Sequence, residues 1–114
     1  MARIKRGIVS KRKHKKLLKA TKGYTGTKSR LIRDAKEAYF HAGQYAYHGR
    51  KLKKRDIRAL WITRISEACK KEGISYSVFI NKLKKGNIEL DRKILNDLVQ
   101  NDPETFRQIV ASVK

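Results

Sequence analysis

The chain has 114 residues, and thirty Lys and Arg against ten Asp and Glu give it a formal net charge of +20. A purely solubilising role is excluded, because roughly 2–8 net charges suffice for a small domain. A single cysteine, Cys69, excludes an internal disulfide framework and indicates a reducing, cytoplasmic compartment. No secretory signal is visible, and no run approaches the roughly 18 apolar residues of a membrane span. Nucleic acid is therefore the expected class of partner.

The charge is distributed unevenly. Residues 1–58 carry twenty basic and three acidic groups, whereas residues 59–114 carry ten basic and seven acidic groups. The first 33 residues hold thirteen Lys and Arg and no acid at all. Such a segment repels itself unless an external anion neutralises it. The step in charge predicts a basic extension over residues 1–58 and a small globular domain over residues 59–114.

Within the extension, we expect helices separated by a glycine turn. Residues 1–7 are expected to form an extended tail and residues 8–21 a helix that is marginal alone, because lysines at i,i+4 repel. Two glycines within residues 22–26 should end that helix. A second helix is expected over residues 27–49, capped by Thr27 or Ser29, with a kink or break at Gly49.

The second helix combines small and aromatic residues. Its small residues recur at helical spacing and would let another surface approach the backbone: Ala35, Ala38, Ala42, Ala46 and Gly49. Aromatic residues alternate with the cations of the extension: Tyr24, Tyr39, Phe40, Tyr45 and Tyr47. Aromatic rings among cations suit stacking on unpaired bases. Alternatively, about half of these rings pack on the C-terminal domain, since aromatics commonly serve as core.

The second half of the chain reads as short amphipathic helices. A basic cluster over residues 50–58 leads into a helix that ends near Glu72, with Gly73 as its stop and Ile74 placed for the usual hydrophobic contact. Further helices are expected after Ser75, after the cap Asp91, and at residues 102–104, where Asp-Pro-Glu is a strong start signal. The predicted fold is all-α: a long basic helical N-terminal extension followed by a small C-terminal helical bundle.

No pattern in the sequence predicts catalysis. His14, His41 and His48 lack metal-ligand spacing, and no P-loop or dinucleotide motif is present. Cys69 is expected to be a buried helix cysteine rather than a nucleophile. We therefore expect no enzyme activity, no cofactor, no metal and no small-molecule substrate. A membrane-surface helix would need a strongly apolar face with aromatics, which residues 8–21 do not offer.

RNA suits the extension better than DNA does. A helix that reads a DNA groove usually needs a pre-folded domain to hold it, whereas this extension is expected to fold on binding. The alternative is a DNA-binding architectural or regulatory protein. Residues of the extension that would contact phosphates, bases or ribose are Arg3, Lys5, Arg6, Lys11, Arg12, Lys13, His14, Lys15, Lys16, Lys22, Gly23, Tyr24, Lys28, Arg30, Arg33, Tyr45, Tyr47, Arg50, Lys51, Lys53, Lys54, Arg55 and Arg58.

Several short motifs between Met1 and about Leu98 follow one another in the same order as in a known protein family. They are Arg3-Ile4-Lys5-Arg6-Gly7, His14-Lys15-Lys16, Lys22-Gly23-Tyr24 with Ser29-Arg30, Ala42-Gly43-Gln44-Tyr45-Ala46-Tyr47, Leu60-Trp61-Ile62-Thr63-Arg64-Ile65, Gly73-Ile74-Ser75-Tyr76-Ser77 and Leu90-Asp91-Arg92-Lys93-Ile94-Leu95. In these motifs the chain resembles the bacterial large-subunit ribosomal protein L-twenty family.

The resemblance implies a structural constituent of the large ribosomal subunit, located on the cytoplasmic ribosome. It implies direct binding to large-subunit (23S-type) rRNA, support of early subunit assembly, and neighbouring large-subunit ribosomal proteins as further partners, with no membrane. By the same resemblance, the extension threads between RNA helices and the globular domain, residues 59–114, binds RNA at a helix junction. Family members in some bacteria also repress translation of their own operon by binding messenger RNA that mimics the ribosomal site.

Overall fold

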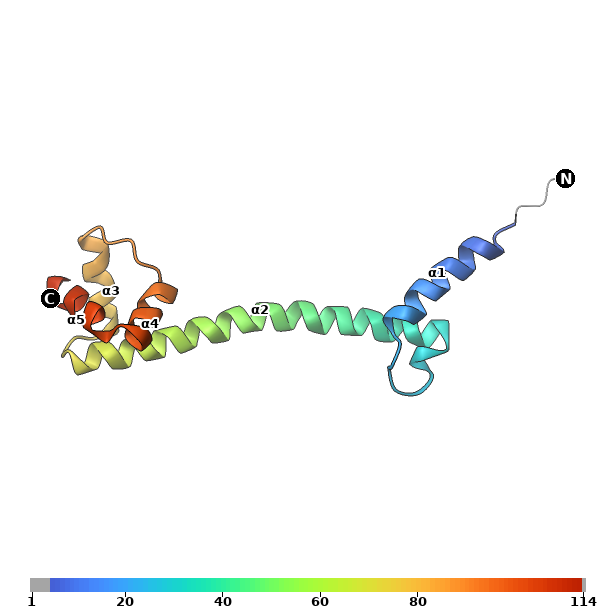
Figure 1. The fold of residues 1–114 in the computed structure, drawn as a ribbon, viewed down its shortest axis with the longest axis horizontal. Helices are drawn as coiled ribbons and strands as arrows, with labels where there is room; N and C mark the ends of the chain where they lie inside the picture. The colour runs from blue at the N-terminus through green and yellow to red at the C-terminus, as the bar shows by residue number, and fades with distance from the viewer. Residues whose placement is uncertain (1–4, 114) are drawn as a thin grey trace. The chain divides into compact units, whose positions relative to one another are not determined.

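The computed structural model describes residues 5–113, so the predicted contact residue Arg3 lies outside the described part. Five α-helices and one 3-10 turn follow in order: α1 (Gly7–Ala20), η1 (Gly26–Ser29), α2 (Ile32–Lys71), α3 (Tyr76–Lys85), α4 (Arg92–Asn101) and α5 (Pro103–Val113) (Figure 1). Residues 5–113 contain no strand, which confirms the all-α prediction.

The chain divides into two compact units, residues 1–51 and residues 52–114. Helix α2 contributes to both, with its first twenty residues in the N-terminal unit and its last twenty in the C-terminal unit. The predicted boundary between residues 58 and 59 also falls inside α2 and stays a prediction.

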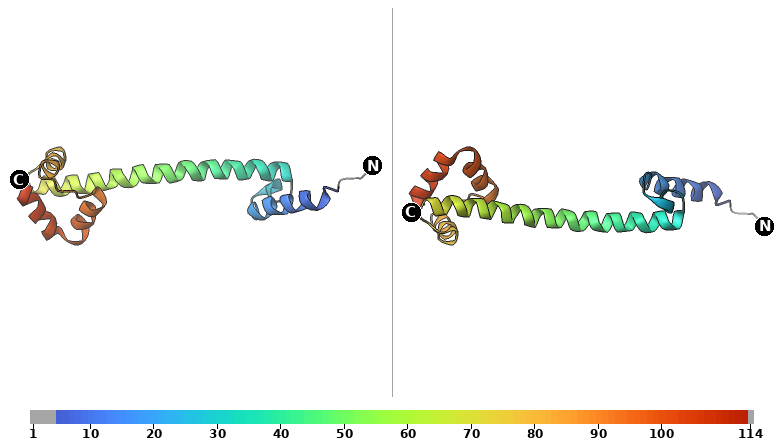
Figure 2. Two further views of the ribbon diagram at one scale, coloured as in Figure 1. Left: turned by 90° about the horizontal axis from the view of Figure 1, so that it is seen from above. Right: turned by 90° about the horizontal axis from the view of Figure 1, so that it is seen from below.

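The N-terminal unit holds α1, the connecting turn and the first half of α2. Figure 2 shows the turn bringing the end of α1 back beside the first residues of α2. Thr21, which ends α1, is fully buried, and its backbone N–H donates to the Leu17 carbonyl at 3.1 Å. Ala35 in α2 is also fully buried. Gly23 and Gly26 have φ of +86° and +74°, a conformation that costs other residues strain, so the predicted glycine turn is confirmed.

Helix α2 begins later than predicted. It starts at Ile32 instead of residue 27, because the Thr27 carbonyl accepts from the amides of Arg30 and Leu31 and closes a 3-10 turn. The Thr27 hydroxyl makes no capping bond to a backbone amide but donates to the Asp34 carboxylate at 2.6 Å. The expected N-cap at Thr27 is therefore wrong: its side chain ties the turn to α2 instead.

The predicted kink or break at Gly49 is also wrong. Helix α2 runs without interruption from Ile32 to Lys71 and includes both Gly43 and Gly49. Neither glycine takes the left-handed conformation that Gly73 adopts directly after the helix. A glycine inside a helix costs about 1 kcal/mol relative to Ala, which a helix of this length tolerates.

The C-terminal unit has one small hydrophobic core. Helices α3, α4 and α5 pack against the last turns of α2 (Figure 1). The core residues come from all four helices and the turn after α2: Ile65, Cys69, Ile74, Phe79, Leu83, Leu95, Phe106 and Val110. Phe79 and Phe106 meet edge to face, with ring centroids 5.7 Å apart. Cys69 is buried as predicted, and burial raises the pKa of its thiol to about 11.

Local start and stop signals position the helices of this bundle as predicted. Gly73 has φ of +73°, and the Ile74 amide donates to the Cys69 carbonyl. Helix α2 therefore ends in the expected C-terminal capping motif, a left-handed glycine followed by a hydrophobic residue. The Asp91 carboxylate accepts from the Ile94 amide at 2.8 Å and caps α4. The Asp102 carboxylate accepts from the Thr105 amide at 3.1 Å at the start of α5. None of the described helices is long and apolar enough to cross a membrane.

Candidate nucleic-acid interface

Helix α1 presents its cations to solvent. It has no buried residue and no acid in its first turn. The cluster from Lys11 to Lys16 is exposed along its whole length, and so are Lys5, Arg6 and Lys22. Only Leu17 and Leu18 of α1 are half-buried, so the helix gains little from tertiary packing and its stability depends on whatever covers its charges.

Almost no carboxylate of the chain neutralises these charges. Among the described cations of the predicted site, Arg33 is the one that forms an ion pair, with its Nε 3.5 Å from Asp34 Oδ1. Asp34 is itself the first acid of the sequence. Within residues 5–113, no cation of α1 forms an ion pair, so the basic surface of this helix is free to bind an external anion.

Asp34 is occupied in holding the turn. The hydroxyl of Thr27 donates to one carboxylate oxygen and Arg33 contacts the other. Hydrogen bonding from Thr27, and then from Arg33, holds the pKa of the Asp34 carboxyl below its ordinary value of 3.8. The Asp34 carboxylate therefore links the connecting turn to the start of α2.

The first half of α2 adds exposed aromatic rings. Tyr39, Phe40, Tyr45 and Tyr47 are all exposed, and none belongs to the core of the C-terminal unit. Tyr24, in the turn, is half-buried. Tyr45 and Tyr47, both predicted as base or ribose contacts, are two residues apart and therefore point to nearly opposite sides of the helix. They do not form one surface.

One face of α2 joins cations to rings that the sequence analysis did not combine. Arg33, Lys36, Phe40, Gln44, Tyr47 and Lys51 recur at steps of three and four residues and so share one side of the helix. Lys36 Nζ lies 6.0 Å from the centre of the Phe40 ring, and Lys51 Nζ lies 4.5 Å from that of Tyr47. Lys36, Phe40 and Gln44 are absent from the predicted contact residues, although this spacing would have identified them. We call this the Arg33–Lys51 face.

The remaining predicted cations continue along α2. Arg50, Lys51, Lys53, Lys54, Arg55 and Arg58 are all exposed. Ile57, Trp61 and Ile65 turn away from solvent as the helix enters the bundle. The helix therefore changes from a fully solvated surface to an amphipathic element within a few residues.

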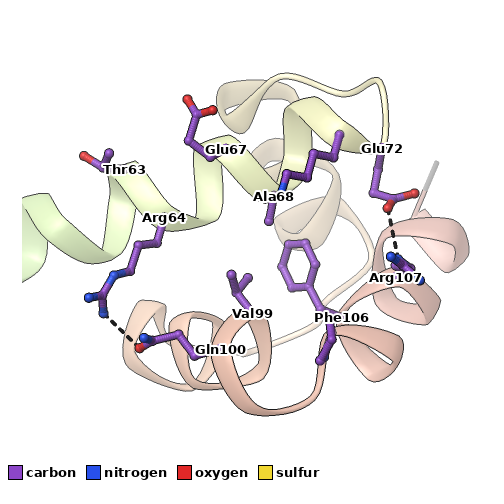
Figure 3. A pocket seen from close by; sticks show the side chains of 11 residues that line it. Thr63, Arg64, Glu67, Ala68, Glu72, Val99, Gln100, Phe106 and Arg107 are labelled. Carbon is purple, nitrogen blue, oxygen red and sulfur yellow. Dashed lines mark hydrogen bonds and ion pairs between the residues drawn. The ribbon is translucent and has the colours of Figure 1, made fainter.

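The bundle itself uses its charges internally. Figure 3 shows a groove in which Phe106 and Val99 point toward Ala68. At its rim, Arg64 donates to the Gln100 side chain at 2.8 Å, and Arg107 pairs with Glu72 at 3.4 Å. Arg64 and Arg107 thus already have partners, whereas the cations of α1 form no ion pair with any described residue. The described residues contain no group of three His, Cys, Asp or Glu placed to hold a metal ion.

Comparison with known proteins agrees with this geometry. The profile of the family described as "Ribosomal protein L20" matches residues 3–109. The chain belongs to the ribosomal protein L20 family. It is 54% identical over 114 residues to "Large ribosomal subunit protein bL20" of Cellvibrio japonicus (strain Ueda107), covering 100% of this chain and 96% of that protein.

Membership of the L20 family makes the chain a constituent of the large ribosomal subunit and locates it on the cytoplasmic ribosome. The resemblance inferred from the sequence motifs is thereby confirmed. Within this L20 protein, the structure leaves the basic surface of residues 5–58 exposed, apart from the half-buried Tyr24. Which of these residues touch an RNA stays a prediction.

Proposed function

We propose that this L20 protein binds large-subunit rRNA directly through residues 1–58 and supports early assembly of the subunit. The observation that carries the proposal is the surplus of exposed cations on α1 and the turn that form no ion pair with any described residue, together with the further exposed cations of α2. An RNA fold supplies the missing phosphates at high density. Binding releases counterions, which drives association without any base-specific contact.

Folded RNA fits this surface better than duplex DNA for two reasons. The cations lie on more than one side of α2, so a partner that surrounds the helix neutralises more of them than a single groove would. Exposed rings stand among the cations, and unpaired bases of a folded RNA offer flat faces for them. Assembly follows from the same physics, because a cationic segment that neutralises phosphates lets RNA helices come together.

Crosslinking in cells, followed by sequencing of the attached RNA, tests the proposal. We expect the recovered RNA to be large-subunit rRNA, concentrated at a limited set of positions. A competition assay complements it: the full chain should prefer structured large-subunit rRNA over duplex DNA of equal length. Equal affinity for both would contradict the proposal and favour a DNA-architectural role.

Autorepression, which the family resemblance implies, would use the same basic surface on a messenger RNA that shares the rRNA site. A translational reporter carrying the leader of this chain's own operon checks it. Expression should fall when the chain is supplied in excess and recover when competing rRNA fragment is added. Unchanged expression would remove this second role while leaving the ribosomal one intact.

A further inference from the structure

We propose that an unpaired base of the bound RNA inserts between Phe40 and Tyr47 on α2, into the space above Gly43. This inference rests on the proposed function, since it requires RNA along the Arg33–Lys51 face. It assigns a contact to Phe40 and a reason for a glycine in the middle of a helix.

The hollow is a feature of one helix face. Tyr39, Phe40, Gly43, Gln44, Tyr47 and His48 line it. Phe40 and Tyr47 are seven residues apart, or two helical turns, which separates them by about 10 Å along the axis. A side-chain atom built onto Gly43 would meet nothing within 4 Å, so no neighbouring side chain covers this glycine.

Both rings are exposed rather than used in packing. Phe40 is 59% exposed and Tyr47 is 52% exposed. Exposed apolar rings are unfavourably hydrated, and a base that stacks on them removes this surface from water. Base–aromatic stacking is worth about 1–3 kcal/mol per base. The Gln44 side chain lines the same hollow and offers one acceptor and two donors to a base edge.

Cations stand at both outer ends of the two rings. Lys36 lies one turn before Phe40 and approaches that ring, and Lys51 lies one turn after Tyr47 and approaches the other. The order along the helix is thus cation, ring, gap, ring, cation. Phosphates on either side of an inserted nucleotide would meet Lys36 and Lys51, so charge complementarity selects a nucleotide over an apolar ligand.

Glycine at position 43 distinguishes this proposal from a simple helix surface. Replacing Gly43 by Ala or Leu should favour the helix, by about 1 kcal/mol for Ala, and no neighbour obstructs a Cβ atom at this position. If Gly43 only weakens the helix, Gly43→Ala and Gly43→Leu should both bind RNA as well as the natural chain or better. If the gap receives a base, Leu should fill it and weaken binding, whereas the single methyl of Ala should be tolerated.

The test measures binding of the full-length chain to a complete large-subunit rRNA transcript containing 4-thiouridine. We expect Gly43→Ala to bind within about twofold of the natural chain, and Gly43→Leu and Phe40→Leu to bind about 5- to 100-fold more weakly. Long-wavelength irradiation followed by mass spectrometry should place a crosslinked nucleotide on the peptide that carries residues 40–47. Gly43→Leu should remove that crosslink.

Circular dichroism of each variant checks that the helix is kept, so weaker binding cannot be ascribed to unfolding. Unchanged binding by Gly43→Leu overturns the inference, whatever Phe40→Leu does. If the natural chain itself shows no salt-dependent binding to the transcript, the proposed function fails instead. Salt-dependent binding by the natural chain with an unaffected Gly43→Leu removes the inserted base alone.

Discussion

The lysine cluster of α1 provides the sharpest test of how this protein binds RNA. Replacing Lys11, Lys15 and Lys16 together by Gln removes three charges that form no ion pair with any of residues 5–113. The side chains remain long and polar, and all three positions are exposed. Removing the repulsion between Lys11 and Lys15 at i,i+4 should favour the helix by roughly 0.2–0.5 kcal/mol. A loss of affinity would therefore come from lost phosphate contacts.

The expected magnitude follows from counterion release. If the natural chain neutralises about 8 phosphates, the slope of log affinity against log salt concentration is about −7, and affinity falls about 10⁴-fold between about 50 and 200 mM salt. Losing three contacts should change the slope to about −4.5 and reduce that fall to about 500-fold. Binding at low salt should weaken as well, because three counterion-releasing contacts are absent.

Filter binding to a large-subunit rRNA transcript across a salt series measures the slope directly. The matched control replaces the same three residues by Arg, which keeps every charge and should keep the slope. A Gln variant whose affinity falls at all salt concentrations with an unchanged slope would refute the reasoning. That result would mean that the cluster shapes the protein and does not contact phosphates.

Three further predictions concern folding. Circular dichroism of residues 1–58 alone should show little helix until RNA is added, since α1 contains no fully buried residue, and stable helix without RNA would contradict this account. Phe106→Ala should destabilise the C-terminal unit by about 3–5 kcal/mol in urea unfolding followed by Trp61 fluorescence, because it opens a cavity against Phe79; a loss below about 1 kcal/mol would argue against the described core. By NMR, the Asp34 carboxyl should titrate below its ordinary value of 3.8, and Thr27→Val should move it upward. The ionised Asp34 carboxylate therefore stabilises the turn fully at a pH above the ordinary pKa, and this stabilisation is lost as the pH falls through the lower pKa of the folded state. If Thr27→Val leaves the titration midpoint of Asp34 unchanged, the Thr27 hydroxyl does not stabilise the carboxylate.

Much of the fold follows from local signals. The positions of Gly73, Asp91 and Pro103 predicted where α2 stops and where α4 and α5 start, and the structure confirms them. Such signals act between residues a few positions apart, so no knowledge of the rest of the fold is needed. The burial of Cys69 was also expected, because free cysteines are among the most often buried residues.

The start and the length of α2 were harder to predict. Thr27 has the chemistry of an N-cap, but its hydroxyl instead donates to Asp34, seven residues away. Gly49 is a residue type that often interrupts a helix, yet α2 continues on both sides of it from Ile32 to Lys71. In each case two local preferences compete within about 1 kcal/mol, which propensity alone does not resolve.

For the candidate site, the sequence by itself determined the sign and the density of charge, and hence the class of partner, because charge does not depend on how the chain folds. Only the tertiary structure decided which of those charges are already paired and which rings escape the core. These features depend on helix continuity and on packing between distant residues, and both are properties of the whole fold rather than of any short segment.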